Sequence, residues 1–151
     1  MTIRCEIVSQ DRAVFQGDAD IVVVPGTDGE MGILPRHVPL LSTLGLGVIK
    51  VRQGTEEHLF TVTGGLVEVQ PDIVTILADA AEDVGEIDIA RAEEARRRAE
   101  QRLAEGPGKD AEALLAAEAA LRRSSLRLDV ARKYGRTTRR SSQFPTSPSG
   151  E

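Results

Sequence analysis

The chain has 151 residues, the length of one ordinary domain or two small ones, and its 40% hydrophobic content is sufficient for a packed core. No apolar run approaches the roughly 20 residues that span a bilayer, so we expect a soluble protein. The net charge of −5 combines −8 in residues 1–85 with +3 in residues 86–151. The first part holds 13 of the 14 valines and the second 12 of the 17 alanines, which favours strands followed by helices and disfavours an alternating Rossmann-type chain.

Short strand patterns separated by turn residues occupy the chain up to Ala78. The turns fall every eight to twelve residues and contain Gly, Pro or Asp, which supply positive φ, a preset φ or local side-chain hydrogen bonds. This spacing is typical of an antiparallel β-sandwich or barrel. The expected strands are 2–8, 13–16, 19–24, 47–52, 57–63, 66–69 and 73–77, with Gly64 and Gly65 in a turn.

The segment 25–41 does not follow strand periodicity. Its three prolines and three glycines predict a long ordered connection, and long loops in compact domains are usually functional. Its large apolar residues have two interpretations, as core or as a partner-facing patch rimmed by Asp28, Glu30 and Arg36. They are Met31, Ile33, Leu34, Leu40 and Leu41.

Two helices are expected in the second part of the chain. The first runs from Asp88, a candidate N-cap, to about Glu105. The second runs from about Asp110 to about Tyr134, with Gly135 as its C-terminal residue. Small and apolar residues recur every three or four positions, which predicts an antiparallel hairpin. The expected seam is Ala92, Ala95, Ala99 and Leu103 against Leu114, Ala117, Leu121, Ser124, Leu128 and Ala131.

These elements give an α+β organisation with three parts. We expect a β-sandwich in residues 1–85, a helical hairpin in residues 86–135 and a disordered tail in residues 136–151, which are polar and rich in Pro and Ser. Because alanine contributes little buried area, the hairpin should be weakly held. A weakly held element can be switched by a ligand that favours one state.

Sequence patterns for catalysis are absent. There is no G-x-S-x-G, H-E-x-x-H, phosphate-loop or G-x-G-x-x-G motif. Cys5 stands in the alternation of strand one and is expected to be a core thiol, and together with His37 and His58 it provides too few ligands for a metal cluster. The start of the chain lacks a secretory apolar stretch, so we expect a cytosolic protein. Few aromatic residues accompany the basic half, which disfavours nucleic acid binding.

The run from Val24 to Leu41, followed by Gly64 to Val69 and Val74 to Asp79, closely resembles the epsilon subunit of bacterial F-type ATP synthase. The resemblance extends over residues 2–134. It implies a ten-stranded β-sandwich followed by two helices, three strands more than the residue pattern indicates.

The resemblance also implies a non-catalytic subunit of a proton-transporting rotary complex. Such a subunit sits on the central stalk, binds the gamma subunit and the c-subunit ring, and couples rotation to ATP synthesis. Its helices inhibit ATP hydrolysis in an extended state that reaches the alpha and beta subunits. The implied location is the cytoplasmic face of the plasma membrane, with membrane association only through the complex. The residues that match the loop facing the ring and gamma are Gly29, Glu30, Met31 and His37.

A second motif, from Ile87 to Ala92, matches the I/L-D-x-x-R-A pattern that the family uses for regulatory ATP binding in a folded-down state. Arginines four or seven residues apart share a helix face, and guanidinium groups from two helices can hold a triphosphate by charge-assisted hydrogen bonds. The resemblance therefore implies an ATP site, without a permanent cofactor or metal. Its residues are Glu82, Asp88, Arg91, Ala92, Arg98, Arg123 and Arg127.

Each of these residues also has a structural interpretation. The arginines could form a solvated helix face, Asp88 could serve only as a cap, His37 could form hydrogen bonds within its loop, and Met31 could be core. Two other functions stay open. One is a free-standing ATP-sensing module of another complex, and the other is a small enzyme using Cys5 or His37, although no triad spacing is present.

Overall fold

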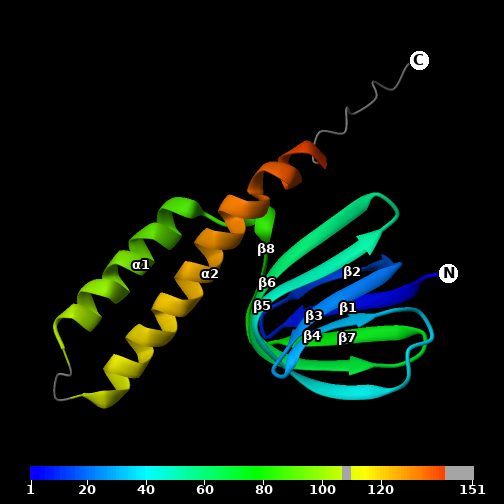
Figure 1. Ribbon diagram of the computed structural model, residues 1–151, viewed down its shortest axis with the longest axis horizontal. Helices are drawn as coiled ribbons and strands as arrows, with labels where there is room; N and C mark the ends of the chain where they lie inside the picture. Colours follow the sequence, from blue (N-terminus) through cyan, green and yellow to red (C-terminus); the bar gives the residue numbers. More distant parts are fainter. Residues whose placement is uncertain (107–109, 142–151) are drawn as a thin grey trace.

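Eight strands form the N-terminal part of the protein, followed by two helices (Figure 1). The computed structural model describes residues 1–106 and 110–141, with side chains up to residue 134. The strands are β1 (Ile3–Ser9), β2 (Ala13–Ala19), β3 (Ile21–Gly26), β4 (Gly29–Ile33), β5 (Leu40–Gln53), β6 (Glu56–Val69), β7 (Ile73–Ala78) and β8 (Ala81–Asp83).

The strands hydrogen-bond in the order β2-β1-β7-β6-β5-β3-β4, and β8 pairs with β6. All neighbouring strands are antiparallel except β1 and β7, which are parallel. The expected sandwich is therefore confirmed, but the expected fully antiparallel pairing is not. The long hairpin of β5 and β6 runs through both halves: residues 60–62 of β6 pair with β8, and residues 65–69 pair with β7. This hairpin joins the two layers of the sandwich.

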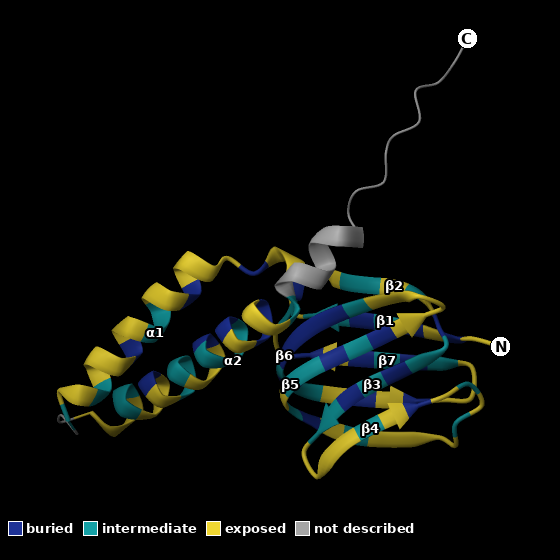
Figure 2. Cartoon of the chain, turned by 45° about the horizontal axis from the view of Figure 1, so that its top comes forward, coloured by how far each residue is buried: buried dark blue, intermediate teal, exposed yellow. Residues whose placement is uncertain are grey.

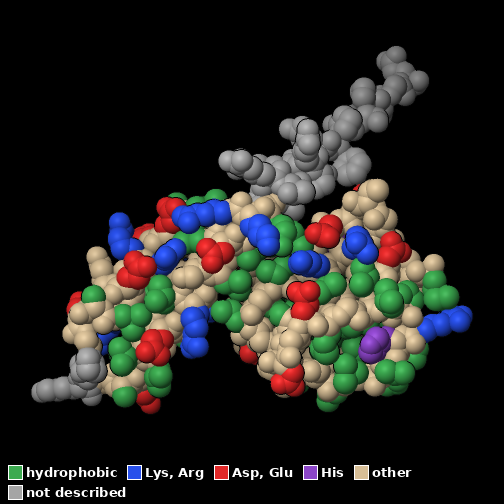
Figure 3. Space-filling view, viewed as in Figure 1, with side chains coloured by type: hydrophobic (Ala, Val, Ile, Leu, Met, Phe, Trp, Pro, Cys, Tyr) green, Lys and Arg blue, Asp and Glu red, His purple; other side chains and the backbone are tan. Residues whose placement is uncertain are grey.

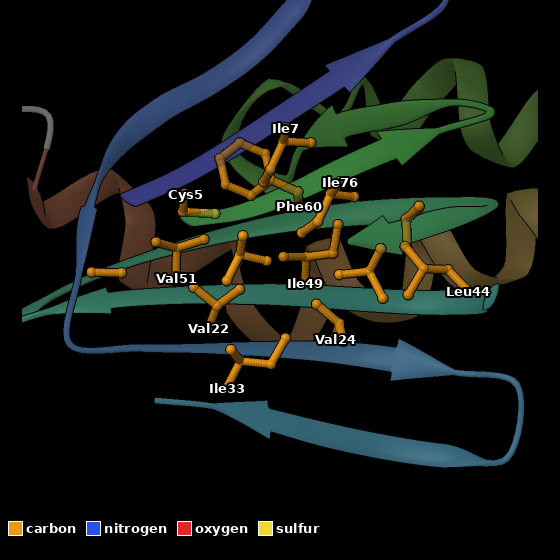
Figure 4. Packing of buried hydrophobic residues seen from close by; sticks show 14 of the residues in the cluster. Cys5, Ile7, Val22, Val24, Ile33, Leu44, Ile49, Val51, Phe60 and Ile76 are labelled. Atoms are coloured by element: carbon orange, nitrogen blue, oxygen red, sulfur yellow. The ribbon is translucent and has the colours of Figure 1, made fainter. Parts of the chain in front are cut away.

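The core of the sandwich follows the expected alternation. In β1, Ile3, Cys5 and Ile7 are fully buried, and Val74 and Ile76 are buried in the adjacent β7. These side chains pack with residues from β3, β5 and β6 between the layers (Figure 4). The period-two pattern therefore predicted which face of these strands is buried.

The expected turn at Gly64 and Gly65 is wrong, because both residues lie inside β6. Their φ angles are +127° and +137°, which L-residues rarely adopt, and a Cβ at Gly65 would collide with the carbonyl oxygen of Leu77. The glycines let a single strand change direction without ending. The described residues therefore form eight strands where the resemblance implied ten, since β5 and β6 each continue from one half of the sandwich to the other.

The expected long connection at 25–41 is also largely wrong. A β3–β4 hairpin occupies most of it, with Val24 opposite Met31 and Gly26 opposite Gly29. The proline that obscured the strand pattern, Pro25, lies where the register between β3 and β5 is irregular, so its missing N–H costs no regular ladder bond. Apart from the two-residue turn at 27–28, only residues 34–39 of this segment have no strand structure.

The helical part begins with a 3-10 turn, η1 (Val84–Glu86), and continues as α1 (Ile89–Ala104) and α2 (Ala111–Ser141). The predicted cap is confirmed, because the Asp88 side chain accepts a hydrogen bond from the Arg91 backbone N–H at 3.1 Å. Asp110 accepts hydrogen bonds from the N–H groups of Glu112 and Ala113 in the same way.

The predicted end of the second helix is wrong. The helix α2 continues through Gly135 to Ser141, so residues 136–141, expected in a disordered tail, are helical. One glycine inside a helix costs only about 1 kcal/mol relative to alanine, and the arginines that follow favour helix. The rest of the expected tail, residues 142–151, lies outside the described residues.

The predicted hairpin seam is confirmed (Figure 2). Six of its residues are buried and the other four are partly exposed. The buried ones are Ala92, Ala99, Ala117, Ser124, Leu128 and Ala131. On another side α2 also contacts η1, β5 and β6, so the hairpin is folded against the sandwich. The contact is a small apolar cluster of Leu59, Val84, Ile87, Val130 and Ala131, edged by Val48, Leu126 and Tyr134.

Candidate functional site

A cavity of about 280 Å³ lies between the sandwich and the helical hairpin. Four alanines contribute to its wall, and these small side chains leave the space open. Two arginines of α2 and a glutamate of β8 add charge. The lining residues are Thr61, Thr63, Ala80, Ala81, Glu82, Ala95, Ala120, Arg123, Ser124, Leu126 and Arg127.

A two-point ion pair crosses the junction beside this cavity. Arg127 Nε donates to Glu82 Oε2 at 2.8 Å, and Arg127 Nη2 donates to Glu82 Oε1 at 3.0 Å. The two side chains are 29% and 30% exposed, so solvent screens the pair only in part. The fork geometry joins α2 to the strand β8, 45 residues earlier in the chain.

Arg123 lies one helical turn before Arg127, as the spacing of four predicted. Among the described residues it has no hydrogen bond or ion pair, and its guanidinium is therefore available to a ligand. It also lines a neighbouring cavity of about 390 Å³ together with Thr63, Asp79 and Arg122. Figure 3 shows Lys and Arg side chains over the hairpin and along its junction with the sandwich.

The other predicted ligand residues do not reach the cavity. Asp88 caps α1, and Arg91 and Arg98 are exposed on the same helix. Ala92 is fully buried in the helical seam. Of the seven predicted residues, the structure therefore brings together three around the cavity: Glu82, Arg123 and Arg127.

The sequence did not predict the hydroxyl groups in the cavity wall as site residues. Ser124 Oγ donates to the Ala120 carbonyl oxygen at 2.8 Å, and Thr61 Oγ1 donates to the backbone carbonyl of Glu82 at 3.4 Å. Thr63 lies two residues further along β6 and lines both cavities. Only the strand period could have placed the two threonines on one face, and nothing in their identity indicates a ligand.

The loop predicted to face partners divides into core and surface. Gly29 and Glu30 are exposed at the start of β4, whereas Met31 is partly buried and packs against the core. His37 is partly buried, and its Nδ1 lies 2.8 Å from the Val38 carbonyl oxygen. Its polar contact is therefore within the loop.

The apolar residues of this segment also divide. Ile33 is fully buried, whereas Leu34 is 56% exposed, Val38 71% and Leu41 68%. Leu40 is 37% exposed, and both Leu40 and Leu41 line a cavity of about 620 Å³ with Pro39, Glu68, Val69, Gln70 and Pro71. Large apolar side chains exposed close together in the chain are typical of interaction surfaces.

Cys5 is the core thiol that the alternation predicted. Burial, followed by the nearby Glu6 carboxylate, raises the pKa of this thiol to about 12, so it is protonated at neutral pH. In the described part of the chain, no three His, Cys, Asp or Glu side chains gather as metal ligands. The described helices include none that is long and apolar enough to cross a membrane.

Two family models match the chain in succession. One is described as "ATP synthase, Delta/Epsilon chain, beta-sandwich domain" and matches residues 2–84. The other is described as "ATP synthase, Delta/Epsilon chain, long alpha-helix domain" and matches residues 86–132.

Several curated relatives are ATP synthase epsilon chains of bacteria. The protein from Dehalococcoides mccartyi is 50% identical over 133 residues, which is 87% of this chain and 93% of that one. The relative from Syntrophobacter fumaroxidans is 50% identical over 131 residues, covering 87% and 96% of the two chains. The relative from Halalkalibacterium halodurans is 45% identical over 130 residues, covering 86% and 97%.

Solved structures share the fold. A chain in the Euglena gracilis mitochondrial ATP synthase complex of OSCP, F1 and c-ring aligns with a TM-score of 0.71 and 23% identity, covering 83% of this chain and 78% of that one. A chain in the central stalk and c-ring of the Tetrahymena thermophila enzyme aligns with a TM-score of 0.53 and 17% identity, covering 89% and 97%. Because the two family models together match most of the chain and the curated relatives match it over nearly their whole length, the chain belongs to the ATP synthase delta/epsilon chain family.

Proposed function

We propose that this chain is the epsilon subunit of a bacterial F-type ATP synthase, a non-catalytic central-stalk subunit. It couples ion-driven rotation to ATP synthesis and restrains ATP hydrolysis through its helices. The observation that carries the proposal is the agreement with bacterial epsilon chains over both the sandwich and the hairpin. Its location is the cytoplasmic face of the plasma membrane, where the complex and not the chain itself provides the membrane attachment.

The sandwich, residues 1–85, is the part that docks on the rotor. Its partners are the gamma subunit and the c-subunit ring. The exposed Leu34, Val38 and Leu41 support this role, because large apolar side chains left in water do not stabilise a monomer and are typical of contacts with partner proteins. Gly29, Glu30 and Met31 of β4 and His37 of the loop that follows it are also proposed to line the contact.

The hairpin, from residue 86 onward, is the regulatory part. In the folded-down state it lies against the sandwich, and in an extended state it reaches the alpha and beta subunits and blocks hydrolysis. Its attachment supports such a movement, since the cluster that joins α2 to the sandwich contains only five buried apolar residues. Releasing it exposes far less apolar surface than opening the sandwich core would.

A regulatory ATP is proposed to bind the folded-down state between the sandwich and α2. The free guanidinium of Arg123 and the partly engaged one of Arg127 would hold phosphate oxygens. The cavity of about 280 Å³ is slightly smaller than the roughly 300–1,000 Å³ of typical ligand sites, so ATP must also occupy the neighbouring cavity or widen the junction. Arg91 and Arg98 would join only after such a rearrangement, and Asp88 would keep α1 capped.

The regulatory role is tested by ATP hydrolysis in reconstituted complexes. A chain ending at Ile87 keeps β8 and η1 but lacks both long helices. We expect it to assemble with gamma and to leave hydrolysis faster than the full chain does. Equal hydrolysis by the two complexes would contradict inhibition, and failure of the full chain to assemble with gamma would instead favour a free-standing nucleotide sensor.

A further inference from the structure

The hairpin is attached to the sandwich by two contacts of different chemistry. One is the apolar cluster in which Val130 and Ala131 of α2 pack against Leu59, Val84 and Ile87. The other is the ion pair between Glu82 and Arg127. Apolar contact is not directional, whereas a two-point hydrogen-bonded pair sets both the distance and the rotation of the helix.

The ion pair leaves part of the arginine available. A guanidinium has five N–H donors, and Glu82 accepts one hydrogen bond from Nε and one from Nη2. The Nη1 donors stay available at the cavity that Arg127 lines. The carboxylate can therefore hold the arginine and an anionic ligand can contact it at the same time.

Other charges at the junction do not replace Glu82. The nearest cationic neighbour on α2, Arg123, has no acidic partner among the described residues. Asp79 does not line the cavity beside Arg127, and among the described residues it makes no ion pair. The pair of Glu82 and Arg127 is thus the sole salt bridge between α2 and the sandwich in the described part of the chain.

We propose that Glu82 is a positioning residue: it latches α2 to β8 in the absence of any ligand and holds Arg127 at the cavity. The consequence for ligand binding rests on the proposed function. If only the docked hairpin binds a triphosphate, loss of the latch lowers the apparent affinity in proportion to the fraction of chains that remain docked. Glu82 then acts through Arg127 and need not contact the ligand.

The chain contains its own reporter of docking. Tyr134 is the single tyrosine and there is no tryptophan, so intrinsic fluorescence reports one site. Its ring packs at the edge of the apolar cluster, with Lys50 Nζ of β5 at 5.9 Å from the ring centroid. Release of α2 from the sandwich removes this shielding, and acrylamide then quenches the fluorescence more strongly.

The experiment compares acrylamide quenching in the full chain without nucleotide. Glu82→Gln and Arg127→Gln are each expected to increase quenching. The ratio of undocked to docked chains should rise roughly fivefold, the factor that about 1 kcal/mol gives in an equilibrium constant at 25 °C. The double variant Glu82→Arg with Arg127→Glu restores the pair and should restore the shielding. Glu93→Gln is the matched control, since it breaks an exposed pair with Arg132 that joins only the two helices.

Unchanged quenching in Glu82→Gln would overturn the latch, and so would a charge-exchanged chain that stays as open as the single variants. Far-UV circular dichroism shows that each variant is folded. A subsequent ATP titration separates positioning from direct contact. A positioning residue predicts weaker ATP binding together with docking that saturating ATP restores, whereas weaker binding with normal docking would show that Glu82 only contacts the ligand. No step requires gamma, so failure of stalk assembly would not affect this test.

Discussion

Single residues decide where the two layers of the sandwich can join. Gly65 has a φ of +137° and lies against the backbone of Leu77, so both its conformation and its space exclude a side chain. Gly54 has a φ of +58°, but a Cβ there would meet nothing within 4 Å. The two glycines therefore separate the cost of a positive φ from the cost of a collision.

Gly65→Ala is expected to destabilise the sandwich strongly. Backbone strain and the shift of β7 together should lower the free energy of unfolding by about 3 kcal/mol or more. Gly54→Ala should cost only about 1 kcal/mol, the strain of a left-handed residue in open space. Urea unfolding of the two variants measures the difference, and equal losses would show that the approach to Leu77 does not matter.

The buried thiol of Cys5 makes stability depend on alkaline pH. Its pKa rises from 9.0 to about 12 on folding, so above pH 9 the unfolded chain loses this proton before the folded chain does. Stability from this group is therefore full below pH 9 and is lost as the pH rises toward 12, by up to about 1.4 kcal/mol per pH unit. Cys5→Ala should flatten the fall in unfolding free energy between pH 9 and 11, and an unchanged slope would contradict the shift.

At the scale of elements, α2 is the helix that connects the parts. One side packs on α1 through small residues, and another packs on the sandwich through Val130 and Ala131. Leu128 is the largest fully buried side chain of the hairpin, at 1% exposure. The docking of both helices therefore depends on few large side chains.

Leu128→Ala should loosen the hairpin without unfolding the sandwich. Truncating a buried leucine costs about 2–5 kcal/mol, a large share of what holds two alanine-rich helices. Amide hydrogen exchange should accelerate across α1 and α2 and stay unchanged in β1 and β7. Leu115→Ala, at a position that is 63% exposed, provides the control and should leave exchange unaltered in both helices.

The sequence predicted elements where local chemistry decides and failed where tertiary contacts decide. The cap at Asp88 and the spacing of small residues in the helices were correct, because capping and helical period are local. Two adjacent glycines, such as Gly64 and Gly65, locally predict a turn. Only the path of β6 through both layers places them inside a strand. Likewise, Thr61 and Thr63 enter the cavity wall only because α2 folds back over β6.

At the scale of the whole molecule, composition divides with architecture. The acidic, valine-rich part forms the sandwich, and the basic, alanine-rich part forms the hairpin folded against it (Figures 1 and 3). The ion pair of Glu82 and Arg127 crosses this division. The exposed leucines at residues 34–41 belong to the acidic part. The two cavity arginines, Arg123 and Arg127, belong to the basic part. The proposed docking surface and the proposed movable hairpin therefore lie in different parts of the sequence and of the fold.

The central claim is that the sandwich docks this chain on an ATP synthase rotor. The most direct measurement is binding of the full chain to the purified gamma subunit and c ring of its own organism. We expect stable binding that Leu34→Glu with Leu41→Glu weakens at least ~10-fold, as charge at the centre of an apolar interface does. Leu115→Glu on α2 should bind like the unaltered chain. Failure of the unaltered chain to bind, or equal binding by all three proteins, would contradict the account.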